Sequence, residues 1–240
     1  MIGSLDQVFK IGAQFRNEGI DSTHNLGFAT CEFYQAYAGL EDIISTTEQL
    51  LSSMVRKVSE LKSGKLKDLP EIGMDFTAPF RRLEFIPALE AAMGHKLPIL
   101  HENTEAVTLE LLSLFETLSI STPPMLTIPR LLDKLSSRYL EPQCIEPTFI
   151  ADHPEALSPL SKTSLLLSQR VELFVNGKEL VNAYEEENSP TGKRRKFVMQ
   201  AGWKDDDVIG GGEGGEGVDE AYCDDSSGAC RRRVDGVGID

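Results

Sequence analysis

Polar side chains that could hold a charged small molecule stand close together near the start of the chain. Glu32 and Tyr34 are two residues apart, so an extended strand points both side chains to the same side. Arg16 comes shortly before them, at the end of an earlier extended segment. A carboxylate, a phenol and a guanidinium together suggest a polar small-molecule site. For these residue types alone, a solvated hairpin whose charges face water is the commoner alternative.

A second group of carboxylates lies on the clearest hairpin of the sequence, over residues 171–184. Its turn is Asn176-Gly177, the strongest two-residue signal for a type I′ turn. With that turn, Phe174 faces Glu179, and Glu172 lies diagonally from Glu179 on the same face of the ribbon. Taken alone, this pattern is also typical of hairpin charges that face solvent.

Asn182 and Glu186 carry further polar groups along the same hairpin. Strict alternation puts both on the opposite face from Glu179. One extra residue between Glu179 and Asn182 would bring all of these groups to one face, and such β-bulges gather beside active sites. We therefore predict a bulge here, whereas a regular ladder through Val181 would contradict it.

Acidic residues outnumber basic ones by 38 to 24, which gives the chain a net charge of −14. This excess argues against broad phosphate tracking along nucleic acid but leaves room for a local basic patch. The four cysteines form no CxxC pair and no metal spacing, which is typical of reduced intracellular proteins. No apolar run approaches the roughly 18 residues of a membrane span, so we expect no membrane partner.

Hydrophobic periodicity predicts both strands and helices. Extended segments are expected at residues 8–16, 28–37 and 144–151, with shorter strand material at 72–84. Helices are expected at residues 40–62, 86–93, 105–118 and 129–139. Residues 1–200 form one domain in this interpretation. Residues 201–240 are rich in Gly and Asp and bury too little apolar area to offset chain entropy, so we expect disorder there.

The string FKIGAQFRNEGIDSTHNLGFATCEFYQAY closely resembles motif 2 of class II lysyl-tRNA synthetases, which we assign to residues 8–37. The blocks LLDKLSSRYLEP, PTFIADHPEALSPLSK and RVELFVNGKELVNAYEEEN follow in the family's order. The final GVGID resembles the start of motif 3. The resemblance implies an α/β (α+β) fold: a class II aminoacyl-tRNA synthetase-like antiparallel β-sheet flanked by helices, incomplete at both ends.

The resemblance also implies a lysine–tRNA ligase, which uses ATP to form lysyl-adenylate and then charges tRNA(Lys). Arg16 would be the catalytic residue, stabilising the α-phosphate of ATP as the carboxylate of lysine attacks. The other implied ATP contacts are Glu18, His24, Asn25 and Phe28. The implied lysine contacts are Glu32, Tyr34, Asn182 and Glu186. Glu172 and Glu179 would hold Mg²⁺ against the phosphates.

The partners implied by the resemblance are lysine, ATP and the acceptor end of tRNA(Lys). Family members form homodimers through motif 1, and this chain starts after the point where motif 1 and the anticodon-binding domain are expected. The motif sequences are most similar to those of fungal organellar members. This similarity favours the mitochondrial matrix, with the cytoplasm as the alternative.

Two departures from the family bear on activity. Leu26-Gly27 stands where the family has Pro-Glu, and the chain ends at Asp240, just before the expected motif 3 arginine. An arginine that meets developing charge contributes orders of magnitude in rate, so we expect weak adenylation by the chain as written. The alternatives are a non-catalytic fragment and a paralogue that lysylates a protein. The strings FRNEGID and NAYEEEN favour the synthetase over that paralogue.

Overall fold

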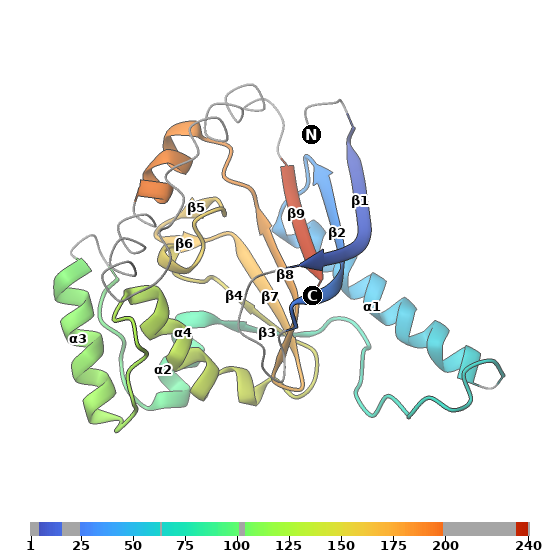
Figure 1. Ribbon diagram of the computed structural model, residues 1–240, viewed down its shortest axis with the longest axis horizontal. Coiled ribbons are helices and arrows are strands. Elements are labelled where there is room, and N and C mark those ends of the chain that lie inside the picture. The colour runs from blue at the N-terminus through green and yellow to red at the C-terminus, as the bar shows by residue number, and fades with distance from the viewer. Residues whose placement is uncertain (1–4, 16–24, 63, 101–103, 199–233, 240) are drawn as a thin grey trace.

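A seven-stranded β-sheet forms the centre of the molecule (Figure 1). The structure is a computed structural model, and it describes residues 5–15, 25–62, 64–100, 104–198 and 234–239. Neighbouring strands are antiparallel except β3 and β4, which run parallel. The sheet order is β1 (Gln7–Phe15), β2 (Gly27–Ala36), β9 (Val234–Ile239), β8 (Lys178–Glu185), β7 (Arg170–Val175), β4 (Thr148–Ala151) and β3 (Arg81–Glu84).

The β7–β8 hairpin turns at Asn176-Gly177, as the sequence predicts. Both residues have positive φ values, 53° for Asn176 and 70° for Gly177. A type I′ turn requires this left-handed backbone at both central positions, and Asn and Gly adopt it most readily. Phe174 accordingly pairs with Glu179.

The predicted bulge is present in β8. Phe174 pairs with Glu179, but the preceding Leu173 pairs with Val181, so Leu180 is the extra residue. A side-chain period of two means that one extra residue exchanges the two faces of the strand beyond it. The bulge therefore returns Asn182 to the face that carries Glu172.

The long helix α1 (Leu40–Lys62) covers one face of the sheet. Glu41 and Asp42 occupy its first turn, where the helix dipole stabilises anions. Its apolar stripe packs on inward-pointing residues of β4, β7 and β8, which fixes the opposite sides of these strands as the other face. The buried members of this core are Ile43, Ile44, Leu51, Phe80, Phe149, Val171, Leu173, Val181 and Ala183.

Three further helices pack on the β4–β7 end of the opposite face (Figure 1). They are α2 (Phe85–Met93), α3 (Thr104–Thr117) and α4 (Ile128–Tyr139). Their buried leucines pack with Ile150 of β4 and Phe174 of β7. The predicted site residues on strands β2, β7 and β8 that the structure describes lie on the same face, farther along the sheet.

Two segments form less strand than predicted. Of residues 72–84 only Arg81–Glu84 pair in the sheet, and of residues 144–151 only Thr148–Ala151 do. Glu141–Gln143, just before the second segment, form a 3-10 turn. Prolines near each segment, Pro79, Pro142 and Pro147, have no backbone N–H to donate to a ladder, which limits strand length there. A small ribbon of β5 (Thr163–Ser164) and β6 (Leu167–Ser168) follows a second 3-10 turn at Glu155–Leu157.

A short helix over residues 190–198 follows β8, although the basic sequence there did not predict one. Ser189 caps it, because the backbone N–H of Gly192 donates to Ser189 Oγ at 3.1 Å. Pro190 stands at the first helical position, where its missing N–H has no cost. Within residues 201–240 the structure describes only β9, which contains most of the GVGID string; the rest lies outside the described residues.

Candidate active site

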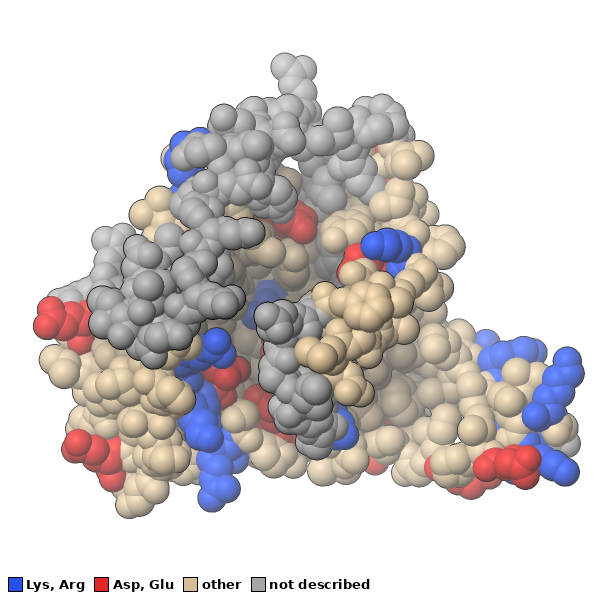
Figure 2. Space-filling view, in the orientation of Figure 1, with Lys and Arg blue, Asp and Glu red and all other residues tan. Residues whose placement is uncertain are grey.

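One row of residues crosses β2, β9, β8 and β7 on the face opposite α1. Glu32 pairs with Gly238, Gly238 with Asn182, and Asn182 with Glu172. Glycine in β9 puts no side chain between Glu32 and Asn182, whose backbones lie two strand spacings, or about 10 Å, apart. The register therefore brings predicted residues from both halves of the chain onto one surface. Figure 2 shows a recess on this face with side chains of both charges in it.

The adjacent row contains Tyr34, Gly236, Tyr184 and Arg170. Glycine again supplies the β9 position, so the gap over this strand continues. The motif comparison did not single out Tyr184 or Arg170. Alternation could have found them, because Tyr184 is two residues after Asn182 and Arg170 is two residues before Glu172 in regular strand.

Tyr34, Glu32 and Glu186 form an acidic group at the β2–β8 part of this face. Burial raises the pKa of Tyr34, and the negative charges of Glu186 and Glu32 raise it further. Glu32 and Tyr34 are two residues apart on one face of β2, and Tyr34 lies in the same row as Tyr184 of β8, two residues before Glu186. Lys10 of β1 lies opposite Glu32, but the two carboxylates beside the phenol outnumber it and favour a cationic ligand.

Glu172 is largely buried, with 14% of its side chain exposed, and two basic residues hold it. Arg170 Nη2 donates to Oε1 of Glu172, and His153 Nε2 donates to Oε2 at 3.0 Å. Burial opposes ionisation, but the positive charges of His153 and Arg170 outweigh it and lower the Glu172 pKa to about 2. The His153 ring also packs against Phe85, with ring centroids 5.1 Å apart. Glu172 is therefore a fixed, ionised carboxylate.

Two further carboxyl groups lie near Glu172, one on α4 (Asp133) and one just after it (Glu141). Burial raises the pKa of Glu141 to about 7, and the charges of Asp133 and Glu172 add to the shift. The pKa of Asp133 is also raised, mainly by burial, although Arg130 opposes the change. The Glu141 carboxyl group is thus partly protonated at neutral pH, beside the ionised Glu172.

Glu172 and Glu179 share the face on which a Mg²⁺ ion would bind. Mg²⁺ beside a nucleotide is usually held by one or two protein carboxylates together with phosphate oxygens, so two carboxylates suffice. Both oxygens of Glu172 already accept hydrogen bonds, but a carboxylate offers about four lone-pair sites and can still bind a cation. Among the described residues, no cluster of three or more His, Cys, Asp or Glu side chains could hold a metal by itself. These two carboxylates are the groups that could take part in a metal site completed by phosphate oxygens.

The residues predicted to contact ATP are only partly described. Arg16, Glu18 and His24 lie outside the described residues. Asn25 is exposed, and Phe28 of β2 is half-buried on the same face as Glu32, four residues away in regular strand. Phe28 therefore stands at the end of the acidic surface that is nearest the loop between β1 and β2.

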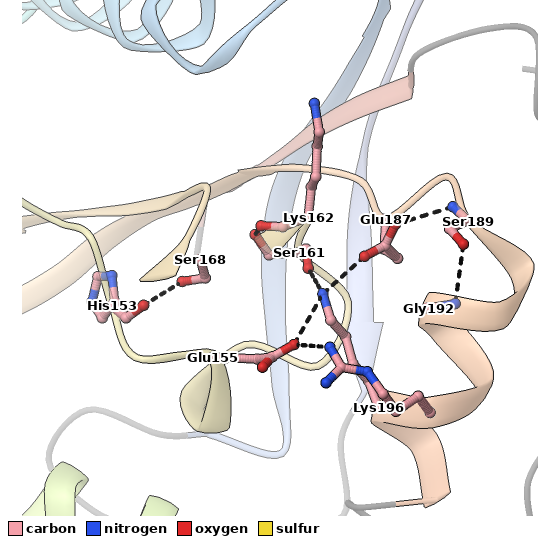
Figure 3. Close-up of polar contacts among 10 residues, drawn as sticks. His153, Glu155, Ser161, Lys162, Ser168, Glu187, Ser189, Gly192 and Lys196 are labelled. Carbon is pink, nitrogen blue, oxygen red and sulfur yellow. Dashed lines mark hydrogen bonds and ion pairs between the residues drawn. The ribbon is translucent and has the colours of Figure 1, made fainter. Parts of the chain in front are cut away.

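A buried lysine anchors the helix over residues 190–198 to the sheet (Figure 3). Lys196 has 2% of its side chain exposed, and its ammonium lies 3.0 Å from Glu187 Oε2 and 4.0 Å from Glu155 Oε1. It also donates to the backbone carbonyl of Ser161. Because Glu187 follows Glu186, and Ser161 pairs with Glu186, this anchor holds the segment just after β8 that carries the predicted lysine contact.

A separate cavity of about 480 Å³ lies beside the start of α1, on the other side of the sheet. Its wall includes Glu41, Arg82, Asp152 and Glu185, together with aliphatic side chains. It contains none of the predicted site residues, and the salt link between Arg82 and Glu41 lies at its exposed rim. We therefore assign the candidate site to the opposite face.

Comparison with known proteins decides the family. The family model for "tRNA synthetases class II (D, K and N)" matches residues 1–208. The chain belongs to this family. The family match confirms the resemblance of motif 2 to class II synthetases. It also confirms the predicted fold class, an antiparallel sheet flanked by helices. None of the helices in the described part of this class II synthetase chain is long and apolar enough to cross a membrane.

Relatives of this class II chain include several lysine–tRNA ligases. The lysine–tRNA ligase cla4 of Cladosporium cladosporioides is 40% identical over 236 residues, which are 93% of this chain and 38% of the relative. The probable cytoplasmic lysine–tRNA ligase of Encephalitozoon cuniculi is 38% identical over 93% of this chain and 45% of the relative. The mitochondrial lysine–tRNA ligase of Schizosaccharomyces pombe is 39% identical over 83% of this chain and 38% of the relative. The chain thus spans less than half the length of each.

Proposed function

We propose that this chain provides the lysine-activation site of a lysine–tRNA ligase. Such an enzyme joins the carboxylate of lysine to the α-phosphate of ATP, which breaks the bond to the β-phosphate and releases pyrophosphate. It then transfers the lysyl group to tRNA(Lys) and releases AMP. Support comes from three relatives of that name, which are 38% to 40% identical to the chain. Further support comes from the chemistry of the face opposite α1.

The single observation that carries this proposal is the acidic group of Glu32, Tyr34 and Glu186, in which both carboxylates raise the pKa of Tyr34. Of the three amino acids that the family's description names, only lysine brings a cationic side chain. The side chain of aspartate would add a third carboxylate to Glu32 and Glu186, and like charges there disfavour binding. Free lysine carries two ammonium groups and one carboxylate, which Glu32, Glu186 and the amide of Asn182 complement.

ATP would lie beside the lysine pocket, toward the loop between β1 and β2. Arg16 would be the catalytic residue that stabilises the α-phosphate, and the ring of Phe28 would stack on adenine. Glu18, His24 and Asn25 would complete the nucleotide loop. Glu172 and Glu179 would hold Mg²⁺, which when bound neutralises charge on the phosphates. The protein's own contribution is to fix both substrates for in-line attack.

The partners follow from the same proposal. The acceptor end of tRNA(Lys) would receive the lysyl group, and charging of tRNA(Lys) by the complete protein would exclude the protein-lysylating alternative. The complete protein would be a homodimer; a monomer mass in sedimentation velocity at micromolar concentration would contradict this.

The relatives include both cytoplasmic and mitochondrial lysine–tRNA ligases. We propose the mitochondrial matrix for the protein that contains this chain, an expectation taken from its motif sequences. Fluorescence microscopy of the complete protein, tagged at its C-terminus, tests this choice. A signal confined to the cytoplasm would contradict it.

Calorimetric titration of the chain with lysine, aspartate and asparagine tests the substrate. We expect lysine to bind most tightly of the three. Glu186→Gln should weaken the affinity for lysine by at least about 10-fold, since hydrogen bonds to charged groups contribute about 1.5–3 kcal/mol. Glu116→Gln, an exposed carboxylate on α3, is the matched control and should change nothing. Equal affinity for aspartate and lysine would overturn the proposal.

A further inference from the structure

Arg170 connects two residues that belong to different parts of the proposed site. Its Nη2 donates to Glu172 Oε1, and its Nε donates to Asn182 Oδ1 at 3.0 Å. Glu172 is the proposed metal carboxylate, and Asn182 is a proposed lysine contact. The two residues face each other on β7 and β8, with Arg170 one pair away on the same face.

The chemistry of arginine determines how the Asn182 amide is oriented. A guanidinium has five N–H donors and no acceptor, so Asn182 must present its oxygen to Arg170. Its NH₂ group then points away from Arg170, and no described residue accepts a hydrogen bond from it. A fixed NH₂ donor on this face suits an anionic group of a ligand, such as the carboxylate of an amino acid.

Glu172 is fixed in the same way. Arg170 engages one carboxylate oxygen, and His153, which is 1% exposed, engages the other. The guanidinium is itself held in place, because Arg170 Nη1 donates to the carbonyl of Leu157 at 2.7 Å. Arg170 has 16% of its side chain exposed, so its hydrogen bonds are partly shielded from water.

We propose that Arg170 is a positioning residue that orients the Glu172 carboxylate toward Mg²⁺ and the Asn182 amide toward the carboxylate of lysine. One side chain thereby couples the metal part and the amino-acid part of the site. This role rests on the proposed function, since it assigns Glu172 and Asn182 to those two ligands. Partners of this kind, behind the residues that touch a ligand, typically change metal affinity about 10- to 100-fold when removed.

The first test needs no ligand. Arg170→Met keeps an unbranched side chain but removes every donor, and Arg170→Lys keeps the charge without the planar fork. In ¹⁵N NMR spectra of the unliganded chain, we expect the Asn182 side-chain NH₂ signals to shift and average in Arg170→Met. Arg82→Met, which removes a guanidinium from an exposed salt link to Glu41, is the matched control. Unchanged Asn182 signals in both Arg170 variants would overturn the orienting role.

The second test measures the ligands. Mn²⁺ in the presence of ATP, followed by electron paramagnetic resonance, reports the metal part, and calorimetry with lysine reports the amino-acid part. We expect Arg170→Met to weaken both about 10-fold or more, and Arg170→Lys to restore less than half of the loss. If Arg170→Met weakened only the Mn²⁺ affinity or only the lysine affinity, or if Arg170→Lys restored both fully, a coupling role of the guanidinium fork would be contradicted. If Arg170→Met does not fold, the Arg170→Lys result decides.

The two tests separate failure of this inference from failure of the proposed function. A wild-type chain that binds neither lysine nor Mn²⁺ with ATP would overturn the proposed function and the ligand assignments with it. The NMR comparison would still decide whether Arg170 orients Asn182. Conversely, normal ligand binding by the wild type and by Arg170→Met would leave the function standing and remove Arg170 from it.

Discussion

Glu172 and Asn182 lie directly opposite each other on β7 and β8 because β8 contains one extra residue, Leu180. Without it, the turn at Asn176-Gly177 would pair Glu172 with Val181 and direct Asn182 into the core under α1. The bulge keeps Val181 and Ala183 in that core while Asn182 stays on the polar face. A single residue thus satisfies both the packing and the proposed site.

Paired cysteines test this register. Residues opposite each other on antiparallel strands have Cα atoms about 4.5–5.5 Å apart, within the range of a disulfide. We expect Glu172→Cys with Asn182→Cys to cross-link under mild oxidation, as mapped by mass spectrometry of peptides. Glu172→Cys with Val181→Cys is the control, because its two side chains lie on opposite faces. Cross-linking of the control pair instead would disprove the bulge.

The acidic pocket makes a prediction about Tyr34. The charges of Glu186 and Glu32 disfavour the phenolate, so removing either charge should lower the pKa of Tyr34 toward its usual value. Titration of the Tyr34 ring carbon by ¹³C NMR measures this in Glu186→Gln and Glu32→Gln. A Tyr34 pKa that is unaffected by both variants would mean that the three side chains do not share a pocket.

Glu141 predicts a pH dependence of stability. Its pKa of about 7 in the folded chain is above the ordinary value of 4.5, so the folded state keeps a proton that the unfolded state loses. The contribution of this group to the free energy of unfolding is therefore fully present below pH 4.5 and is lost as the pH rises through 7. We expect Glu141→Gln to raise the free energy of unfolding at pH 8 by about 1–3 kcal/mol, with little change at pH 4.5.

Urea unfolding at the two pH values measures this effect, with Glu116→Gln on the exposed side of α3 as the control. The same gain at both pH values would show that the Glu141 side chain acts by packing and not by its charge.

The Lys196 anchor should contribute to stability. Lys196→Met leaves the largely buried carboxylate of Glu187 without its cation, whereas Glu155 keeps Arg195 at 2.5 Å. Breaking a buried ion pair from one side costs about 3–5 kcal/mol, whereas replacing both partners by apolar residues is often neutral. We therefore expect Lys196→Met to be strongly destabilising in urea unfolding and the added change Glu187→Leu to recover part of the loss. No recovery would mean that Lys196 acts through Glu155 or Ser161 alone.

The sequence predicted the elements that depend on local signals. The Asn176-Gly177 turn, the apolar period of α1 and the need for a bulge before Asn182 each follow from neighbouring residues. The helix over residues 190–198 was missed because its buried contacts come from lysines, which carry no apolar period. Ser189 followed by Pro190 was the available signal for its start.

The contacts around Glu172 depend on the fold as a whole. His153 is far from Glu172 along the chain and meets it only because β4 pairs with β7. Arg170 could be placed on the right face by alternation, but its bond to Asn182 requires the register that the bulge sets. Residue type and spacing thus identified the groups that would touch ligands, whereas the residues that orient them needed the structure.

Amino-acid-dependent ATP–pyrophosphate exchange tests the central claim, that this face activates lysine, most directly. The assay is best run on the chain and on a chimera in which it replaces the matching segment of the Cladosporium cladosporioides relative. We predict that the chimera exchanges with lysine, that aspartate and asparagine do not replace it, and that Glu186→Gln removes the signal. Exchange driven by aspartate or asparagine, or no exchange with lysine by the chimera, would contradict the account.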